Sequence, residues 1–370
     1  MAKLGEVCLL KAGKFVSAND ISPEYNKGLY PCFGGNGIRG YVADYTHDGE
    51  FPLIGRQGAL CGNVNLASGK FHATEHAVVV QPKIEMNVHW LYYALNAMNL
   101  GQYATGAAQP GLAVSKLETL SIEIPNISEQ NKIAQTLYKV EQLVNFRKQQ
   151  LAKLDELVKA RFVEMFGTFP ANPFRWSIGK IQDVVSDVRY GSSRPAVEGG
   201  KYPYLRMNNI TYSGELDLRD TKRIDIPDSE LDKCTVRRGD VLFNRTNSKE
   251  LVGKTCVYNR DELMVLAGFV IRVRINERIR PEVLSAFLNM DFSKRMLIGM
   301  CKTAIGQANI NAKELQNIDL YIPPIELQDQ FVTLKNKIDQ QKQTVQQSLE
   351  KLELLKNCLL YTSPSPRDCS

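Results

Sequence analysis

Glycine-rich stretches of the kind that hold phosphate groups occur twice in this chain. "GNGIRG" (35–40) has the G-x-G-x-x-G spacing of a dinucleotide loop, but such a loop follows a strand and opens a helix. Here the following "YVADYTHDG" is extended and turn-like. "GKT" (253–255) resembles the end of a phosphate-binding loop, but Ser248 occupies the position of its first glycine. We therefore expect the first stretch to let the backbone approach some other ligand, and we expect no phosphate loop at the second.

Two further tripeptides resemble parts of catalytic sites. "NPF" (172–174) lacks the second proline of the N-P-P-[YF] loop with which amino-methyltransferases hold a target amine. "DTK" (220–222) has the D-x-K form of half a nuclease site, without a convincing metal carboxylate upstream. No Ser/His/Asp or Cys/His set has local support. The sequence predicts a chain with no catalytic residues.

Metal and cofactor chemistry has equally little support. The eight cysteines are scattered with no C-x-x-C pair, which favours reduced thiols over a disulfide framework or a zinc site. His72 and His76 are four residues apart, but the surrounding "KFHATEHAVVVQP" is typical of a strand, where they would not share a helical face. We expect no metal site and no cofactor in this chain.

Length and charge limit the class of protein. With 370 residues the chain can form two or three domains, and no stretch approaches the roughly 18 apolar residues of a membrane span. We expect a cytoplasmic protein. The net charge is +6, and the excess lies in residues 166–325, which have 24 Lys and Arg against 19 Asp and Glu. Fifteen of these are arginines, the residue suited to bidentate binding of phosphate and guanine, although a solvated surface would look the same.

The chain repeats itself after 198 residues. Residues 109–157 align with 307–355 without a gap, and thirteen of the 49 positions are identical, including Gln109, Ile124, Pro125 and Gln130. "IEIPNISEQNKIAQTLYKVEQL" (122–143) thus recurs as "LYIPPIELQDQFVTLKNKIDQQ" (320–341). Solenoid repeats are much shorter, so two copies of a domain-sized unit are indicated.

A long helix follows each globular part, because apolar residues recur there in steps of four and three. These are Ile133, Leu137, Val140, Val144, Leu151, Leu154 and Val158 in the first helix, and Phe331, Leu334, Ile338, Val345, Leu349, Leu352 and Leu355 in the second. Ser128 is the expected N-cap of the first. Neither helix can bury its stripe alone, so we expect antiparallel packing, which would put the globular domains at opposite ends. The alternative is two separate partner-binding helices.

The fold class follows from these elements. We expect an α+β chain in which two similar mixed α/β domains are separated by a long antiparallel two-helix coiled coil, with a pseudo-twofold internal repeat. Gly, Pro and Asn break both globular parts into short apolar segments, and 88–98 is a clear helix matched by "PEVLSAFLNM" (281–290). The expected boundaries are 1–125 and 168–325 for the domains, 126–167 and 326–358 for the helices, and 359–370 for a tail.

At this point the sequence resembles the specificity subunits of type I restriction-modification systems, the S or HsdS family. The resemblance covers residues 1 to about 358 and is carried by "YPCFGGNGIRGY", by the pair "LIGRQG" and "LFNRTN", and by the helix starts "IPNISEQNKIA" and "IPPIELQDQFV". It implies two target-recognition domains that read an asymmetric bipartite DNA sequence. "YPYLRMNNITYSGEL" lacks the GGNG glycines, so we expect the two domains to belong to different subtypes.

The resemblance also implies partners. These are double-stranded DNA, two methyltransferase subunits docked on the helices, and a restriction and motor subunit. S-adenosylmethionine, ATP and magnesium would belong to the partner subunits, as would the deoxyribonuclease and adenine methyltransferase activities.

The candidate DNA-binding residues lie in loops and at strand ends, where Arg can address guanine and Asn or Gln adenine. They are Asn36, Arg39, Arg56 and Gln57 in the first domain, and Arg206, Asn208, Asn209, Arg245, Thr246 and Asn247 in the second. For each of them the alternative is a phosphate contact or an ordinary turn residue.

Two rival functions stay open from sequence. One is a coiled-coil scaffold whose globular heads bind a ligand other than nucleic acid, and the other is the detached recognition half of a fused restriction-methyltransferase. The Ser/Pro-rich "YTSPSPRDCS" (361–370) leaves the heptad pattern. We expect a disordered tail that is foreign to the gene.

Overall fold

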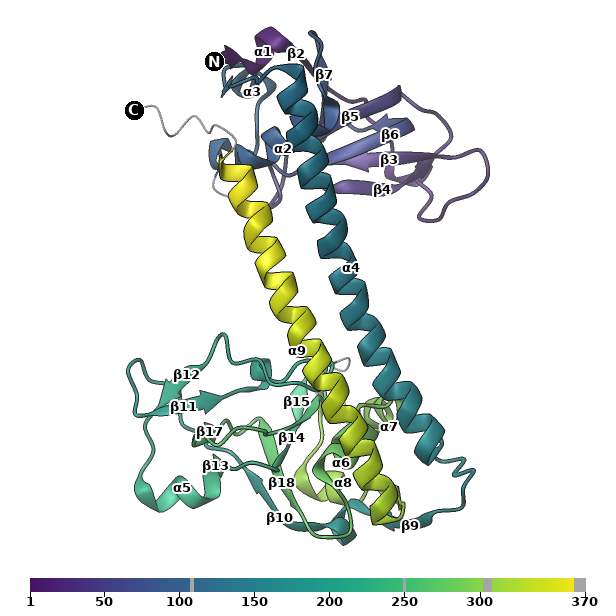
Figure 1. Cartoon of the computed structure of the whole chain (residues 1–370), viewed down its shortest axis with the longest axis vertical. Coiled ribbons are helices and arrows are strands. Elements are labelled where there is room, and N and C mark those ends of the chain that lie inside the picture. The colour runs from purple at the N-terminus through teal and green to yellow at the C-terminus, as the bar shows by residue number, and fades with distance from the viewer. Residues whose placement is uncertain (107–109, 249–250, 302–307, 363–370) are drawn as a thin grey trace. The chain divides into compact units, whose positions relative to one another are not determined.

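The computed structural model describes residues 1–106, 110–248, 251–301 and 308–362 (Figure 1). The chain divides into two compact units. Unit 1 comprises Met1–Lys148 with Gln346–Ser370, and unit 2 comprises Gln149–Val345. The two long helices, α4 (Ile127–Phe166) and α9 (Ile325–Thr362), contribute residues to both units. Helix α9 thus continues past the expected end at 358, and the remainder of the expected tail, 363–370, lies outside the described residues.

Unit 1 is built on one six-stranded sheet in the order β2-β7-β5-β6-β3-β4. Its strands are β2 (Cys8–Ala12), β3 (Tyr30–Gly34), β4 (Gly37–Val42), β5 (His47–Gly55), β6 (Val64–Ala73) and β7 (Ala77–Pro82); a separate pair joins β1 (Ala2–Lys3) to β8 (Ser121–Ile122). Its shorter helices are α1 (Leu4–Val7), α2 (Val88–Ala97) and α3 (Val114–Glu118), with 3-10 turns at Ala18–Asp20 and Leu100–Tyr103. All strand neighbours in the sheet are antiparallel except β3 and β6, which are parallel.

The sheet of unit 1 is buried on both faces. Side chains alternate along a strand, and on β7 Val78 and Val80 join the cluster that contains Trp90 of α2. Val79, between them, joins a second cluster with Phe71 of β6. Strand β7 is therefore buried and apolar from Ala77 to Val80, and becomes exposed at Gln81.

Unit 2 contains two four-stranded sheets, ordered β10-β18-β14-β16 and β12-β11-β17-β13. The strands are β10 (Val185–Tyr190), β11 (Tyr202–Leu205), β12 (Lys222–Ile224), β13 (Thr235–Val236), β14 (Val241–Asn244), β16 (Thr255–Val257), β17 (Met264–Leu266) and β18 (Val270–Ile275). Two short pairs join β15 (Thr246–Asn247) to β19 (Ala308–Asn309) and β9 (Ser177–Lys180) to β20 (Asp319–Ile322). The helices are α5 (Asp228–Cys234), α6 (Pro281–Asn289), α7 (Asp291–Met300) and α8 (Ala312–Gln316), with 3-10 turns at Ile181–Val184 and Met207–Asn209.

The two sheets of unit 2 reproduce the single sheet of unit 1 in two pieces. The order β10-β18-β14-β16 matches β2-β7-β5-β6, and β12-β11-β17-β13 matches β4-β3-β6-β5. The parallel pair β3 and β6 has its counterpart in β11 and β17, which are also parallel. The long strands β5 and β6 are each interrupted in unit 2, giving β13 with β14 and β16 with β17. The internal repeat is thus present in the topology.

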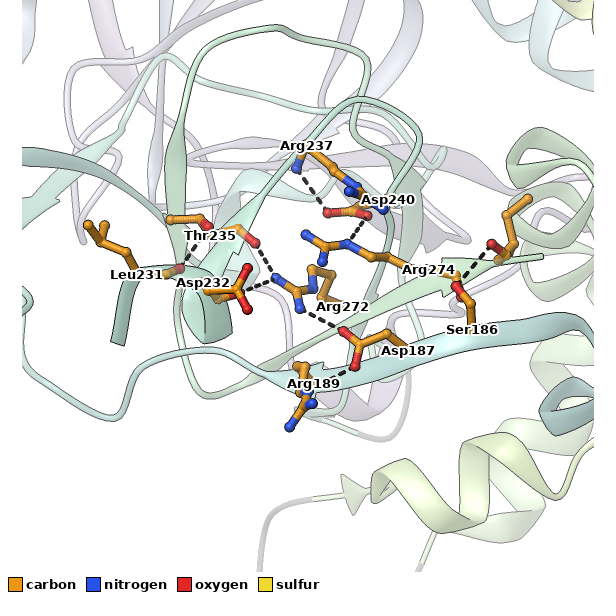
Figure 2. Close-up of polar contacts among 11 residues, drawn as sticks. Ser186, Asp187, Arg189, Leu231, Asp232, Thr235, Arg237, Asp240, Arg272 and Arg274 are labelled. Carbon is orange, nitrogen blue, oxygen red and sulfur yellow. Dashed lines mark hydrogen bonds and ion pairs between the residues drawn. The ribbon is translucent and has the colours of Figure 1, made fainter. Parts of the chain in front are cut away.

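A buried arginine joins the two sheets of unit 2 (Figure 2). Arg272 of β18 donates to the backbone oxygens of Asp232 and Thr235, where α5 leads into β13. Its other Nη atom donates to Asp187 of β10 at 2.7 Å. The guanidinium therefore links the sheet that contains β18 to the start of strand β13 in the other sheet. In unit 1 the corresponding strand, β5, is continuous.

Helices α4 and α9 run antiparallel within each unit, as predicted. In unit 1, Glu141 pairs with Lys356 at 2.5 Å and Lys148 with Glu353 at 2.9 Å. In unit 2, Asp155 pairs with Lys342 at 2.5 Å, and the ring of Phe162 contacts that of Phe331, with centroids 5.5 Å apart. The partner's number falls as the α4 number rises, which is the antiparallel register.

The start of α4 and the end of the α9 stripe differ from prediction. The helix begins at Ile127, and the side chain of Asn126 accepts a hydrogen bond from the N–H of Glu129 at 3.0 Å. Asn126 is thus the N-cap, and Ser128 lies inside the first turn. Most residues of the predicted apolar stripes are buried or half-buried, but Leu355 is exposed. The buried part of the α9 stripe therefore ends before Leu355.

The repeated glutamines Gln130 and Gln328 have two hydrogen bonds in common, and Gln328 also donates to the oxygen of Arg278 at 3.0 Å. Gln130 accepts from the N–H of Asn87 at 2.9 Å and donates to the oxygen of Pro125 at 2.9 Å. Gln328 accepts from the N–H of Arg280 at 2.8 Å and donates to the oxygen of Pro323 at 2.8 Å. Each buried amide thus ties a long helix to the residue before α2 or α6 and to its own Ile-Pro junction.

Candidate nucleic-acid interface

In unit 1 three turns meet at the end of the sheet where β5 stops. The turn between β3 and β4 approaches so closely that a Cβ added to Gly55 would lie 1.9 Å from the backbone oxygen of Gly35. Asn36 in this turn accepts a hydrogen bond from Asn63 at 2.8 Å. The "GNGIRG" stretch therefore forms a hairpin turn and opens strand β4, which excludes the dinucleotide loop and brings Asn36 to the end of β5.

Arg56 directly follows β5. Its backbone is held by two hydrogen bonds, whereas its side chain has no hydrogen bond among the described residues. Its N–H donates to His76 at 3.0 Å, and its oxygen accepts from Leu112 at 2.9 Å. Its Nε is buried, and among the described residues no acceptor contacts it. Gln57 is exposed and pairs through its backbone with Gly111. A buried N–H without an acceptor is costly unless a ligand satisfies it.

The structure brings Asn36, Arg56 and Gln57 to one edge, and Arg39 lies nearby on β4. Arg39 is exposed, and its side chain runs beside Gly34. The same edge contains two residues that the sequence reasoning missed, Glu75 and His76, in the turn between β6 and β7.

His76 Nε2 lies 3.1 Å from a carboxylate oxygen of Glu75 at this edge. His76 Nδ1 and Glu75 Oε2 are buried, and neither has a hydrogen-bond partner in the part of the chain that the structure describes. The only signal in the sequence was their place directly before the strand "AVVVQP" (77–82). The edge therefore offers donors and acceptors from three segments that are distant in sequence.

Unit 2 repeats the frame around Arg56 at Arg245. The N–H of Arg245 donates to Phe269 at 3.0 Å, and its oxygen accepts from Ile310 at 3.0 Å. These contacts match those of Arg56 with His76 and Leu112. The Nε of Arg245 is also buried without an acceptor among the described residues. Its guanidinium lies over the ring of Tyr190, 4.7 Å from the centroid.

The other candidates in unit 2 have different environments. Asn208 is exposed. Arg206 donates to the carboxylate of Asp220 at 2.9 Å and to its backbone oxygen at 3.1 Å. Asn209 is 1% exposed, accepts from the N–H of Arg206, and donates to Asp217 at 2.8 Å. Its side-chain amide makes its hydrogen bonds within the turn, as an ordinary turn residue does.

Thr246 and Asn247 form strand β15, which pairs with Ala308 and Asn309 of β19. The hydroxyl of Thr246 donates to the side chain of Asn309 at 3.3 Å. The backbone of Asn247 is placed by this pairing, and its side chain lies outside the described residues. The segment after β14 thus lies beside the segment that precedes α8.

In each unit, the residue directly before β6 or β16 donates a side-chain hydrogen bond to the turn that contains Asn36 or Asn208. In unit 1 this is Asn63, which contacts Asn36, and in unit 2 it is Lys254, whose Nζ donates to the oxygen of Met207 at 2.8 Å. Burial lowers the pKa of Lys254. Lys254 therefore contributes a partly desolvated cation beneath the turn that contains Asn208.

The edges suit hydrogen bonding to a polar macromolecule better than bond-making chemistry. They present guanidinium, amide, imidazole and carboxylate groups, which are the groups that read base edges and phosphates. Among residues 1–106, 110–248, 251–301 and 308–362, no three His, Cys, Asp or Glu side chains are placed to hold a metal ion. Within the same ranges, no helix is long and apolar enough to cross a membrane.

Residues 1–156 and 175–354 match the family described as "Type I restriction modification DNA specificity domain". The chain belongs to this family. The two matched segments correspond to the two repeats of the fold.

Relatives in this family include the EcoprrI specificity subunit of Escherichia coli, 53% identical over 143 residues, which are 38% of this chain and 36% of that protein. The EcoKI specificity subunit of Escherichia coli K12 is 22% identical over 260 residues, 66% of this chain and 56% of that protein. The chain spans between about a third and just over half of these two relatives.

The fold is similar to a solved S subunit of a type I restriction-modification system from M. genitalium, with a TM-score of 0.60 and 18% identity over 97% of this chain and 94% of that one. A structure reported for complex assembly and conformational transition of a type I system is similar with a TM-score of 0.56 and 17% identity, covering 97% and 95% of the two chains. These similarities confirm the α+β fold with its helical spacer.

Proposed function

We propose that this chain is a DNA-recognition subunit of a type I restriction-modification complex and that each unit reads one half of a bipartite, asymmetric target. The observation that carries the proposal is the repeated arginine. Arg56 and Arg245 occupy the same place in two copies of one frame, each with an unsatisfied buried Nε. Family membership supplies the ligand class, since the family is one of DNA specificity domains.

The asymmetry of the target follows from the neighbours of the two arginines. Arg56 lies with Asn36, Gln57, Glu75 and His76, whereas Arg245 lies on Tyr190 and beside β15. Different donor and acceptor sets favour different bases, so two identical half-sites are not expected. The candidate residues are proposed as DNA contacts, Arg39, Asn208 and Asn247 included, except Asn209, whose amide is already hydrogen-bonded inside its turn.

The chain is proposed to act without catalysis of its own, in the cytoplasm. Two methyltransferase subunits and a restriction and motor subunit would bind it, and S-adenosylmethionine, ATP and magnesium would be bound by those partners. The boundaries of the reading domains are proposed as 1–125 and 168–325. The scaffold and fused-methyltransferase alternatives find no support among the relatives, which are specificity subunits.

Methylation sequencing tests the proposal. DNA is exposed to the chain together with its cognate methyltransferase subunits, and methylated positions are mapped. We expect one motif of two short, different parts around a fixed gap. The methyltransferase subunits without this chain are the control and should give no such motif. An ungapped motif, or none with the complete set, would contradict the proposal.

A further inference from the structure

The backbone of Arg245 is fixed by hydrogen bonds, but its side chain has no polar partner among the described residues. No acceptor among the described residues contacts its guanidinium, and its Nε is buried. A long side chain of this kind samples several rotamers unless packing holds it. The ring of Tyr190 is the group that supplies this packing, since the guanidinium carbon lies 4.7 Å from the ring centroid.

Tyr190 is itself held at both ends. Its backbone is the last residue of β10 and pairs with Ile271 of β18. Its hydroxyl oxygen accepts a hydrogen bond from the N–H of Ala312, the first residue of α8, at 2.8 Å. The ring is nevertheless 41% exposed, so it is a rigid platform at the surface and not a core residue.

Unit 1 has no aromatic ring at the matching position. Ala12 pairs with Val78 as Tyr190 pairs with Ile271, and the following residues, Gly13 and Gly191, make matching hydrogen bonds to the strand opposite. The residue that corresponds to Tyr190 is therefore alanine. The two repeats share the arginine and differ in how its side chain is supported.

We infer that Tyr190 is a positioning residue for base reading by unit 2, which fixes the plane of the Arg245 guanidinium so that its N–H groups meet acceptors on a base edge. The inference rests on the proposed function. With one face of the guanidinium covered by the ring, the N–H edge remains for two parallel hydrogen bonds, the geometry by which arginine reads guanine. An arginine held in this way loses less freedom on binding than a free one.

The test uses the full chain with its cognate methyltransferase subunits and duplexes that carry single-base changes in each half of the motif. Tyr190→Leu removes the ring, whereas Tyr190→Phe keeps the ring and removes only the acceptor for Ala312. We expect Tyr190→Leu to reduce discrimination roughly 2- to 5-fold at one or two positions of one half, as loss of a cation–π contact implies. Tyr190→Phe should retain most of it, and the other half should be unchanged in both variants.

Arg245→Ala and the double variant Arg245→Ala/Tyr190→Leu separate positioning from a structural role. If Tyr190 acts through Arg245, the double variant discriminates no worse than Arg245→Ala alone. Full wild-type discrimination in Tyr190→Leu would overturn the inference, as would an equal loss in both halves or strictly additive losses.

A second measurement does not depend on the folding of Tyr190→Leu. The Nε–H signal of Arg245 in the free wild-type chain should show the ring-current shift of a proton over an aromatic ring, and Tyr190→Phe should keep it. A signal at an ordinary position would overturn the inference. If the wild-type complex gave no gapped motif, the proposed function would fail, while the signal would still report whether the platform exists.

Discussion

Arg272 and Asp187 form an ion pair of 2.7 Å in unit 2, in which the arginine is 2% exposed. The arginine needs this partner because a buried guanidinium without a countercharge is strongly destabilising. Since Arg272 also binds the backbone that begins β13, the ion pair stabilises the junction of two sheets (Figure 2). In unit 1 the continuous strand β5 joins these two parts of the sheet. In unit 2, where β13 and β14 are separate strands, the ion pair of Arg272 joins them instead.

Asp187→Ala should therefore lower the free energy of unfolding of unit 2 by about 2 to 4 kcal/mol, because it leaves Arg272 buried with backbone acceptors alone. The measurement is chemical unfolding followed by a probe in unit 2. Asp261→Ala is a matched control, since its ion pair with Arg238 is exposed and should make no measurable difference. An Asp187→Ala variant as stable as the control would show that the ion pair does not hold the sheets.

The same carboxylate predicts a pH dependence. Burial raises the pKa of Asp187, but hydrogen bonds and charge from Arg272 and Arg189 outweigh it and hold the pKa below its usual 3.8. A lowered pKa in the folded state means that the stabilisation is complete above the unfolded value and is lost as pH falls through the folded one. As pH falls below the unfolded value and through the lowered folded pKa, Asp187→Asn should lose less stability than the wild type. Parallel pH profiles would contradict this.

The paired glutamines allow a third prediction. Gln130→Ala would leave the N–H of Asn87 and the oxygen of Pro125 without their partner, and Gln328→Ala would do the same at Arg280 and Pro323. Each should lower the free energy of unfolding of its own unit by roughly 1 to 3 kcal/mol. Hydrogen exchange at the amides of Asn87 and Arg280 measures the loss separately in each unit. The exposed Gln135→Ala is the control, and equal protection in all three variants would contradict the assignment.

The sequence predicted the elements that depend on local pattern. The repeat of 198 residues aligned Gln130 with Gln328, and the structure shows that both side chains make the same pair of hydrogen bonds. The heptad stripe predicted antiparallel helices, since neither α4 nor α9 can bury its apolar residues alone. Helices 88–98 and 281–290 were also predicted to within a residue of their observed ends.

Features that depend on distant pairing were missed. Glu75 and His76 reach the edge only because β5 and β7 are neighbours in the sheet, which no local pattern shows. The turn around Asn209 differs for a local reason, since "MNN" forms a 3-10 turn in which the Asn209 side chain accepts from the N–H of Arg206. The counterpart of β6 is divided into β16 and β17 by the loop between them. The length of this loop in the sequence does not indicate that the sheet divides there.

The last prediction compares the two arginines directly. Arg56→Lys and Arg245→Lys keep the charge but lose the planar fork, so each should reduce discrimination at one base pair by about 1 to 3 kcal/mol, or roughly 5- to 150-fold, in one half of the motif only. The affected half should differ between the two variants, because the arginines belong to separate units. Competition with duplexes altered in one half at a time measures this.

The salt dependence of binding decides between base and phosphate contacts at the same two arginines, with lysine and alanine variants of each. If an arginine contacts a base, its lysine variant should keep the slope of affinity against salt and lose sequence preference. If it contacts phosphate, Arg→Ala should reduce that slope by about one counterion and weaken binding to every sequence alike. Arg39→Lys serves as a comparison on the same edge, because Arg39 is exposed on β4 and is not part of the repeated frame. Loss of preference in the same half from both Arg56→Lys and Arg245→Lys would contradict the assignment of one half-site to each unit.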